Sequence, residues 1–195
     1  MLRPVLTVAP SGAIVTLAEA KLHLRVDYTD DDALIQGLID AAVAHLDGYS
    51  GRLGRPLLNQ TWAQSFADFT SSPWRLRFAD FNAVTSITYY DLSNASQTLS
   101  STIYSVLTDE IGPYITLQSG KSYPNIYPRD DAITVTWTCG FGATAANIPA
   151  DIKVAIKMMV THWYENRGVI VTEKRLESIP MTVDALLVKY SRVAM

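Results

Sequence analysis

The sequence lacks the features that would indicate a secreted protein or a membrane protein. Its 195 residues include one cysteine, Cys139, so no disulfide can form within the chain and no thiolate metal site is available. No apolar run approaches the roughly 20 residues that a membrane-spanning helix needs. The N-terminus also lacks the apolar core of a signal peptide. We therefore expect a protein that is made inside the cell and makes no contact with a membrane.

Charge is also scarce. Charged residues make up 18% of the chain, against about a quarter in a typical globular protein. The formal net charge is −3, so the basic surface that a DNA- or RNA-binding protein normally presents is not indicated. This net charge is still compatible with a protein that encloses DNA without binding it tightly. The low charge also leaves neutral surface, which favours contacts between subunits.

Motifs that carry chemistry are missing as well. The sequence contains no nucleophile elbow and no phosphate-binding glycine loop. The three histidines, His23, His45 and His162, are far apart in sequence and form no zinc-protease pattern. The acidic run at 30–32 lacks the spacing of a calcium loop, and it is more simply explained as a helix cap. We expect no catalytic residue, no cofactor, no metal and no enzyme activity.

Helical periodicity is present near both ends of the chain. A short helix should begin at Thr16, which stands at capping-box spacing from Glu19. A second helix should begin at Asp31 or Asp32, and a third should follow Pro149. The second and third helices each carry one apolar stripe, formed by Leu34, Ile35, Leu38, Ile39, Ala42, Val43 and Leu46, and by Ile152, Ala155, Ile156, Met159, Val160 and Trp163. Two such stripes can bury each other.

Between these helical segments the period of the apolar residues changes to two, which indicates strands. The clearest strand is 133–139, where Ile, Val, Trp and Cys alternate with threonines. We predict an α+β fold: a small helical bundle or hairpin body split by an antiparallel β-sheet or sandwich of about five or six strands, with an extended C-terminal tail. The predicted divisions are an extended lead-in at 1–15 within N-terminal body helices at 1–59, a β insert at 60–140, a long helix at 141–168 and a tail at 169–195.

Two pairs of residues admit both a structural and a functional interpretation. Arg52 and Arg55 lie in a glycine-rich segment that is either a turn or a contact to a partner. Glu165 and Arg167 lie near a helix end, where a cation suits the helix dipole but a salt bridge between subunits is the alternative. The tail follows, and its residues 182–193 could form a short amphipathic helix with an apolar face of Val183, Leu186, Leu187 and Tyr190.

Several segments, taken in order, resemble the head–tail connector (adaptor) family of long-tailed bacteriophages and related particles, including gene transfer agents. The resemblance runs from about residue 17 to about residue 190. The segments that carry it are 17–27, 33–35, Gly51-Arg52-Leu53-Gly54-Arg55-Pro56-Leu57, 84–91, Val135-Thr136-Trp137-Thr138-Cys139-Gly140-Phe141-Gly142, 148–153 and Trp163-Tyr164-Glu165-Asn166-Arg167. This family has no catalytic residues.

The resemblance implies a structural protein of the virion neck, synthesised in the bacterial cytoplasm. Identical subunits, commonly a dodecamer, would form a ring under the portal, and DNA would pass through its lumen without sequence-specific binding. The other side of the ring would receive the next neck protein, a stopper or tail terminator. The family's C-terminal segment reaches the portal, which here implies portal contacts by Val183, Leu186, Leu187, Tyr190 and Arg192. The expected subunit interface involves Arg52, Arg55, Glu165 and Arg167.

Two rival interpretations stay open from the sequence. The first is a monomeric binding module whose β insert recognises a peptide or a glycan through Trp74, Tyr89, Tyr90 and Tyr104. The second is a hydrolase built on the three histidines.

Overall fold

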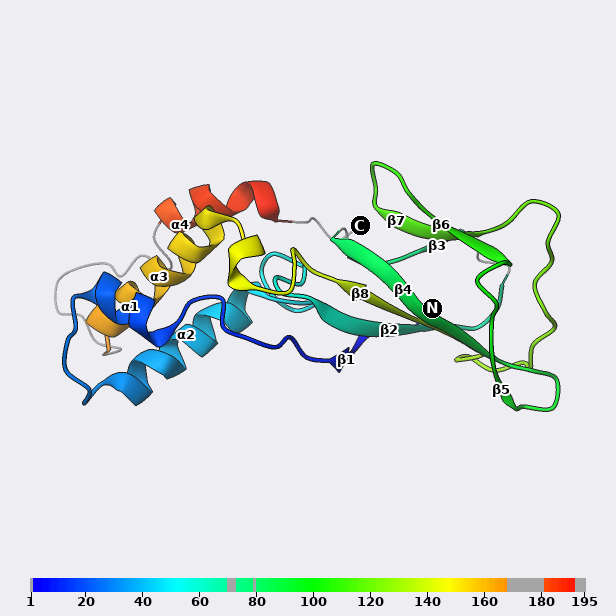
Figure 1. Ribbon diagram of the computed structural model, residues 1–195, viewed down its shortest axis with the longest axis horizontal. Helices are drawn as coiled ribbons and strands as arrows, with labels where there is room; N and C mark the ends of the chain where they lie inside the picture. Colours follow the sequence, from blue (N-terminus) through cyan, green and yellow to red (C-terminus); the bar gives the residue numbers. More distant parts are fainter. Residues whose placement is uncertain (1, 70–72, 79, 168–180, 192–195) are drawn as a thin grey trace. The chain divides into compact units, whose positions relative to one another are not determined.

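The computed structural model describes residues 2–69, 73–78, 80–167 and 181–191. The chain divides into two compact units. The β unit comprises Met1–Ser11 and Asn59–Phe141, and the helical unit comprises Gly12–Leu58 and Gly142–Met195. The first is built of antiparallel strands and the second of helices (Figure 1), which confirms the predicted α+β class.

The helical unit contains the helices that the periodicity predicted. They are α1 (Leu17–Leu24), α2 (Asp32–Leu46), α3 (Ala150–Glu165) and α4 (Met181–Leu187), with short 3-10 turns at Ala145–Asn147 and Val188–Tyr190. The capping box at the start of α1 is confirmed: the backbone N–H of Glu19 donates to Thr16 Oγ1 at 3.2 Å, and the Thr16 N–H donates to Glu19 Oε2 at 2.8 Å. These bonds satisfy two backbone donors that a helix start would otherwise leave open.

The core of the helical unit forms where α2 packs on α3. The buried positions of α2 are Ile35, Ile39, Ala42 and Leu46, and those of α3 are Ile152, Ala155, Ile156, Met159 and Val160. Their spacing of three and four residues places each set on one side of its helix. The two predicted stripes therefore bury each other through these nine residues, whereas Leu34 is exposed and Leu38, Val43 and Trp163 are only half-buried. Helices α1 and α4 also pack on α3.

A tight turn follows α2 and brings the chain back to the helical core. A Cβ atom at Gly51 would lie 2.2 Å from the Asp47 carbonyl oxygen, so only glycine fits there. The Asp47 carboxylate accepts a hydrogen bond from the Leu57 N–H at 2.7 Å, and Leu53 and Leu57 are fully buried. The glycines at 51–54 thus serve a turn, which is one of the two interpretations that the sequence allowed.

The β unit has two antiparallel sheets. The five-stranded sheet has the order β1 (Val5–Val8), β2 (Gln60–Phe66), β8 (Ile133–Cys139), β4 (Phe81–Tyr90) and β5 (Ser96–Thr98), and the three-stranded sheet has the order β3 (Trp74–Arg75), β7 (Pro113–Leu117) and β6 (Tyr104–Thr108). Two of these strands, β1 and β5, were not predicted. The segment expected to be a lead-in instead pairs with β2 and forms an edge of the sheet.

Aromatic side chains fill the space between the two sheets. Trp62 of β2 lies opposite Trp137 of β8, and every second residue of both strands is buried. Phe66 of β2 stacks on Trp74 of β3 with ring centroids 5.4 Å apart, and this contact joins one sheet to the other. We call the side of the five-stranded sheet that carries Trp62, Phe66 and Trp137 its inner face. Large aromatic groups contribute much of the buried area in a core of this size.

The packing of α2 on α3 predicts a large difference between two exchanges to alanine. Ile39→Ala, at a buried position, should lower the free energy of unfolding by about 2–5 kcal/mol because it leaves a cavity in the core. Leu22→Ala, at an exposed position of α1, should change it by less than about 0.5 kcal/mol. Urea denaturation followed by circular dichroism measures both. Equal effects of the two exchanges would contradict the assigned core.

Candidate functional site

The C-terminal helix α4 is held on the helical unit by its apolar face. Val183 is 0% exposed and Leu187 is 2% exposed, and both belong to the helix that packs on α3. Leu186 and Tyr190 are half-buried, and Arg192 lies outside the described residues. The apolar face predicted from the sequence therefore exists, but within the described residues its two best buried members contact their own subunit.

The opposite face of this segment presents apolar groups to solvent. Met181 is 78% exposed and Val188 is 70% exposed. We call the pair of Met181 and Val188 the outer tail surface. Sequence reasoning missed it because the helical period assigns only one apolar face to a short helix, and these two residues stand off that face.

Polar contacts fasten the same segment at three points. Arg52 Nη2 lies 2.7 Å from Asp184 Oδ1, and Lys189 Nζ lies 2.6 Å from Asp151 Oδ2. Arg55 Nη1 donates to the Tyr190 carbonyl oxygen at 3.3 Å. The ion pairs are largely exposed, so each contributes little to stability alone. Together they fix the direction in which the segment runs over the turn at 51–55 and the start of α3.

The structure thus brings together two groups of residues that the sequence kept apart. Arg52 and Arg55 were expected at a subunit interface, whereas the residues of α4 were expected at the portal. Here both arginines contact the C-terminal segment of their own subunit.

The start of α3 favours the contact with Lys189. Asp151 lies in the first turn of this helix, where the helix dipole stabilises a negative charge. The hydrogen bond from Lys189 lowers the pKa of Asp151, and the Tyr190 hydroxyl adds a weaker hydrogen bond at 3.3 Å. The carboxylate is therefore ionised at neutral pH and available to the tail.

A second polar cluster joins the end of α3 to the start of α2. Asp31 Oδ2 accepts hydrogen bonds from the Tyr164 hydroxyl at 2.5 Å and from Arg167 Nη2 at 2.8 Å. The Tyr28 hydroxyl lies 2.9 Å from that of Tyr164, and the Arg167 guanidinium lies 4.2 Å from the centre of the Tyr164 ring. We call these four residues the Asp31 cluster.

The hydrogen bonds of the Asp31 cluster shift two ionisation equilibria. The Tyr164 hydroxyl and then Arg167 lower the pKa of Asp31, and the carboxylate in turn raises the pKa of Tyr164. Asp31 stands at the cap position of α2, as predicted, but its side chain makes no capping hydrogen bond. The expectation that its side chain caps the helix is wrong for this residue, because the carboxylate binds Tyr164 on α3 and Arg167 just beyond it.

Of the residues expected at the subunit interface near this helix end, Arg167 is paired with Asp31 of the same chain. Glu165 is exposed. Arg167 follows Asn166, the C-cap residue of α3. The Asp31 cluster therefore attaches the end of α3 to the start of α2.

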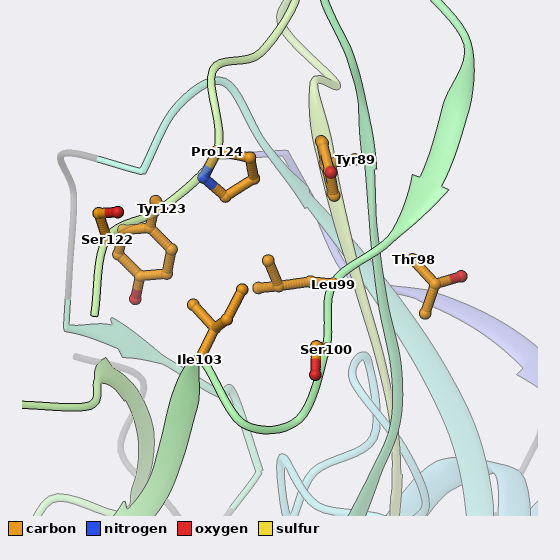
Figure 2. Close-up of a pocket in the computed structure, with 8 residues that line it drawn as sticks. All are labelled: Tyr89, Thr98, Leu99, Ser100, Ile103, Ser122, Tyr123 and Pro124. Carbon is orange, nitrogen blue, oxygen red and sulfur yellow. The ribbon is translucent and has the colours of Figure 1, made fainter. Parts of the chain in front are cut away.

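The β unit contains an open pocket with a volume of about 330 Å³. It lies beside β5 and carries both hydroxyl and apolar groups, and none of its lining residues is charged (Figure 2). The lining residues are Tyr89, Thr98, Leu99, Ser100, Ile103, Ser122, Tyr123 and Pro124. Such a pocket suits a neutral group.

The aromatic residues of the rival binding module are not gathered in one surface. Trp74 is 1% exposed and stacks in the core, so it cannot contact a ligand. The ring of Tyr90 is covered by the Arg129 guanidinium at 3.8 Å. Tyr104 is partly buried, which raises its pKa. Of the proposed set, only Tyr89 lines the pocket.

Other chemical sites are not indicated in the described part of the chain. Within residues 2–69, 73–78, 80–167 and 181–191, no group of three or more His, Cys, Asp or Glu side chains could hold a metal ion. Cys139 is fully buried on the inner face of the sheet. None of the described helices combines the length and the apolar character that crossing a membrane would require.

The fold over the whole chain resembles that of components of gene transfer agent (GTA) particles. A chain from the neck of an empty GTA particle, computed with C6 symmetry, has a TM-score of 0.77 and 22% sequence identity to this protein. The match covers 100% of this chain and 97% of the neck chain. A chain from the virion of a native GTA particle has a TM-score of 0.76 and 21% identity. A chain from the neck of a native GTA particle, computed with C12 symmetry, has a TM-score of 0.74 and 21% identity. Likeness at these identities establishes a shared fold.

The sequence gives a more direct assignment. No curated protein matches it significantly. Residues 14–110, however, match the family of phage gp6-like head-tail connector proteins, and this range spans α1, α2 and the strands β2 to β6. Through these residues, the chain belongs to the phage gp6-like head-tail connector family.

Proposed function

We propose that this protein is the subunit of a ring that connects the portal vertex of a phage-like particle to its tail. The family match over residues 14–110 carries the proposal. The fold that it shares with chains from GTA necks, one of them computed with C12 symmetry, supports a cyclic arrangement of identical subunits. The place of action would be the neck of the virion.

Such a protein acts by surface complementarity and not by chemistry. We propose that it is not an enzyme and that DNA passes through the ring without sequence-specific contacts. The net charge of −3 supports this, because extensive phosphate contacts would hold DNA tightly and oppose its passage. The portal on one side and the next neck protein on the other are the proposed partners.

For the portal contact, we propose the C-terminal segment, with its residues divided between two tasks. Val183 and Leu187 hold α4 on its own subunit, since both are buried there. The outer tail surface, Met181 and Val188, would meet the portal together with the half-buried Leu186 and Tyr190. Arg192 and the rest of 169–195, as far as they lie outside the described residues, remain part of the proposed portal-binding element.

The function can be tested by mixing the purified protein with portal rings from the same particle. Light scattering and electron microscopy should show a ring of this protein bound coaxially to the portal. A protein that stays monomeric and does not bind portal rings, at any concentration reached in the particle, would overturn the proposal. Binding to an unrelated portal serves as the control for specificity.

Exchanges on the two faces of α4 should have different effects. Met181→Glu with Val188→Glu places charges on the outer tail surface, and we expect portal affinity to fall about tenfold or more. Because both side chains are exposed, the melting temperature should stay unchanged. Leu187→Ala should instead lower the free energy of unfolding by about 2–5 kcal/mol.

These exchanges are a sharper test than deleting residues 180–195. Deletion would also uncover the apolar surface that Val183 and Leu187 cover, so a loss of binding would have two explanations. Normal portal attachment by the Met181→Glu, Val188→Glu double variant would exclude the outer tail surface from the contact. A melting temperature that falls in the double variant would contradict the assigned exposure.

The Asp31 cluster predicts a dependence of stability on pH. The pKa of Asp31 is lowered in the folded protein, so its contribution is present above the ordinary value of about 4. It is lost as pH falls below that value through the folded pKa. The helical unit should therefore become less stable on acidification, and Asp31→Asn should make this dependence shallower.

Urea denaturation at a series of pH values between about 6 and 2 measures this effect. Asp30→Asn is the matched control, because the neighbouring Asp30 has no hydrogen-bond or ion-pair partner among the described residues. Equal pH dependence of the Asp31→Asn variant and the unaltered protein would show that the cluster does not act as described.

A further inference from the structure

The edge strand β1 has no covered face. All four of its residues are exposed, with Val5 at 61%, Leu6 at 42% and Val8 at 57%. Alternate residues are buried in β2 and β8 of the same sheet, whereas β1 shows no alternation. An apolar strand of this kind is a site where another chain can pair.

The sequence around β1 does not protect its edge with charge. Residues 4–10 contain no charged side chain, although charge is a usual means of keeping an edge strand single. Among the described residues, β2 is its only neighbour in the sheet. Pro4 and Pro10 limit the segment in which the backbone can pair, because proline cannot donate a hydrogen bond. A short apolar edge is left open.

The other edge of the same sheet is β5, and it is also exposed. Beside it lies the uncharged pocket with Leu99, Ile103 and Pro124 among its lining residues. Figure 2 shows Leu99 and Ile103 on the same side of the backbone as Tyr89, while the Thr98 side chain points away from them. One unit of the chain thus carries an apolar strand at one edge and an uncharged pocket at the other.

The register of the strands assigns each side chain of β1 to a face. Leu6 lies opposite Trp62, whose side chain is on the inner face, whereas Val5 and Val8 lie opposite Ala63 and Thr61 on the outer face. An irregularity between Leu6 and Val8 places both valines on the same side.

At the other edge, Gln97 lies opposite Tyr89, and Thr98 lies opposite Thr88. Tyr89 in turn lies opposite Ile133 of β8, so it belongs to the inner face, and Thr98 belongs to the outer face. The pocket beside Tyr89 is therefore on the inner face, the side of the sheet on which Leu6 projects from β1.

The direction of the strands favours a head-to-tail contact. Four antiparallel pairings lead across the sheet from β1 to β5: β1 with β2, β2 with β8, β8 with β4, and β4 with β5. Each pairing reverses the strand direction, and four reversals restore it. The strands β1 and β5 therefore run in the same direction. If the sheets of two copies were joined edge to edge in the same orientation, β1 of one would lie parallel to β5 of the other, and their inner faces would be continuous.

We propose that the ring closes through this contact: β1 of each subunit lies beside β5 of the next, and its Leu6 enters the pocket lined by Leu99 and Ile103. The occupant of the open edge is thus a second copy of the chain. The inference rests on the proposed function, because a contact between two different surfaces of one chain generates a ring when its rotation closes. A contact of β1 with β1 would instead be symmetric and would end at a dimer.

Disulfide formation between introduced cysteines can test the contact in assembled rings. The native Cys139 is fully buried, so the background reaction should be low. Val8→Cys combined with Thr98→Cys places both thiols on the outer face, and Val5→Cys with Thr98→Cys covers the adjacent register. After oxidation on portal rings, one of these pairs should give a ladder of covalent multimers on a non-reducing gel, because neighbouring strands bring Cα atoms within disulfide range.

The control pair is Leu6→Cys with Thr98→Cys, whose side chains lie on opposite faces and should not join. The single variants should give no multimers. Rings that form without a ladder from either valine pair would overturn this inference and leave the proposed function intact. Dimers from Val5→Cys or Val8→Cys alone would show the symmetric β1 contact instead. The absence of both rings and ladders would overturn the two proposals together.

A second experiment does not depend on the exact register. Leu6→Lys brings a charge to the uncharged pocket of the neighbour, and it should abolish ring formation as measured by light scattering with portal rings. Leu107→Lys is the matched control, since Leu107 has similar exposure at 47% but lies on β6 of the other sheet. Circular dichroism should show both variants folded. Rings of normal size from the Leu6→Lys variant would contradict the contact.

Discussion

The burial of the α2 stripe against the α3 stripe is the contact on which the helical unit depends. The two helices come from segments separated by residues 59–141 of the β unit, so neither can bury its apolar side without the other. Once α3 is in place, it also supports α1 and α4. The Asp31 cluster at one end of α3 and Asp151 at its start then attach polar contacts to an element that the apolar core has already positioned.

The helices could be predicted because their signals are local. A capping box, a period of three and four, and a proline just before the helix start identified α1, α2 and α3 to within a few residues. The strand β8 was equally clear from its alternation. By contrast, β1 and β5 have four and three residues. No period can be recognised over such lengths, and their strand character arises from pairing with distant partners.

The candidate site was also only partly predictable from the sequence. The period of the tail predicted an apolar face that included Val183 and Leu187, and both side chains are buried. An apolar period predicts that one face of a helix is buried, but it does not identify the surface that buries it. Here α3 of the same subunit covers the apolar face of α4. Asp31 is a comparable case, because the sequence predicts its position at the helix cap but not the hydroxyl of Tyr164, which lies 133 residues away.

The path of the chain between its units has a consequence for biosynthesis. The β unit is complete once residue 141 has been made, whereas the helical unit still needs its second half, 142–195. During synthesis from the N-terminus, α1 and α2 must therefore wait with their apolar stripe uncovered while the strands between them and α3 are translated and can fold. The helical unit, with its tail, is the last part to mature. A chain released from a ribosome that stalls within the β unit would lack α3 and α4, so the apolar stripe of α2 would have no helix to cover it.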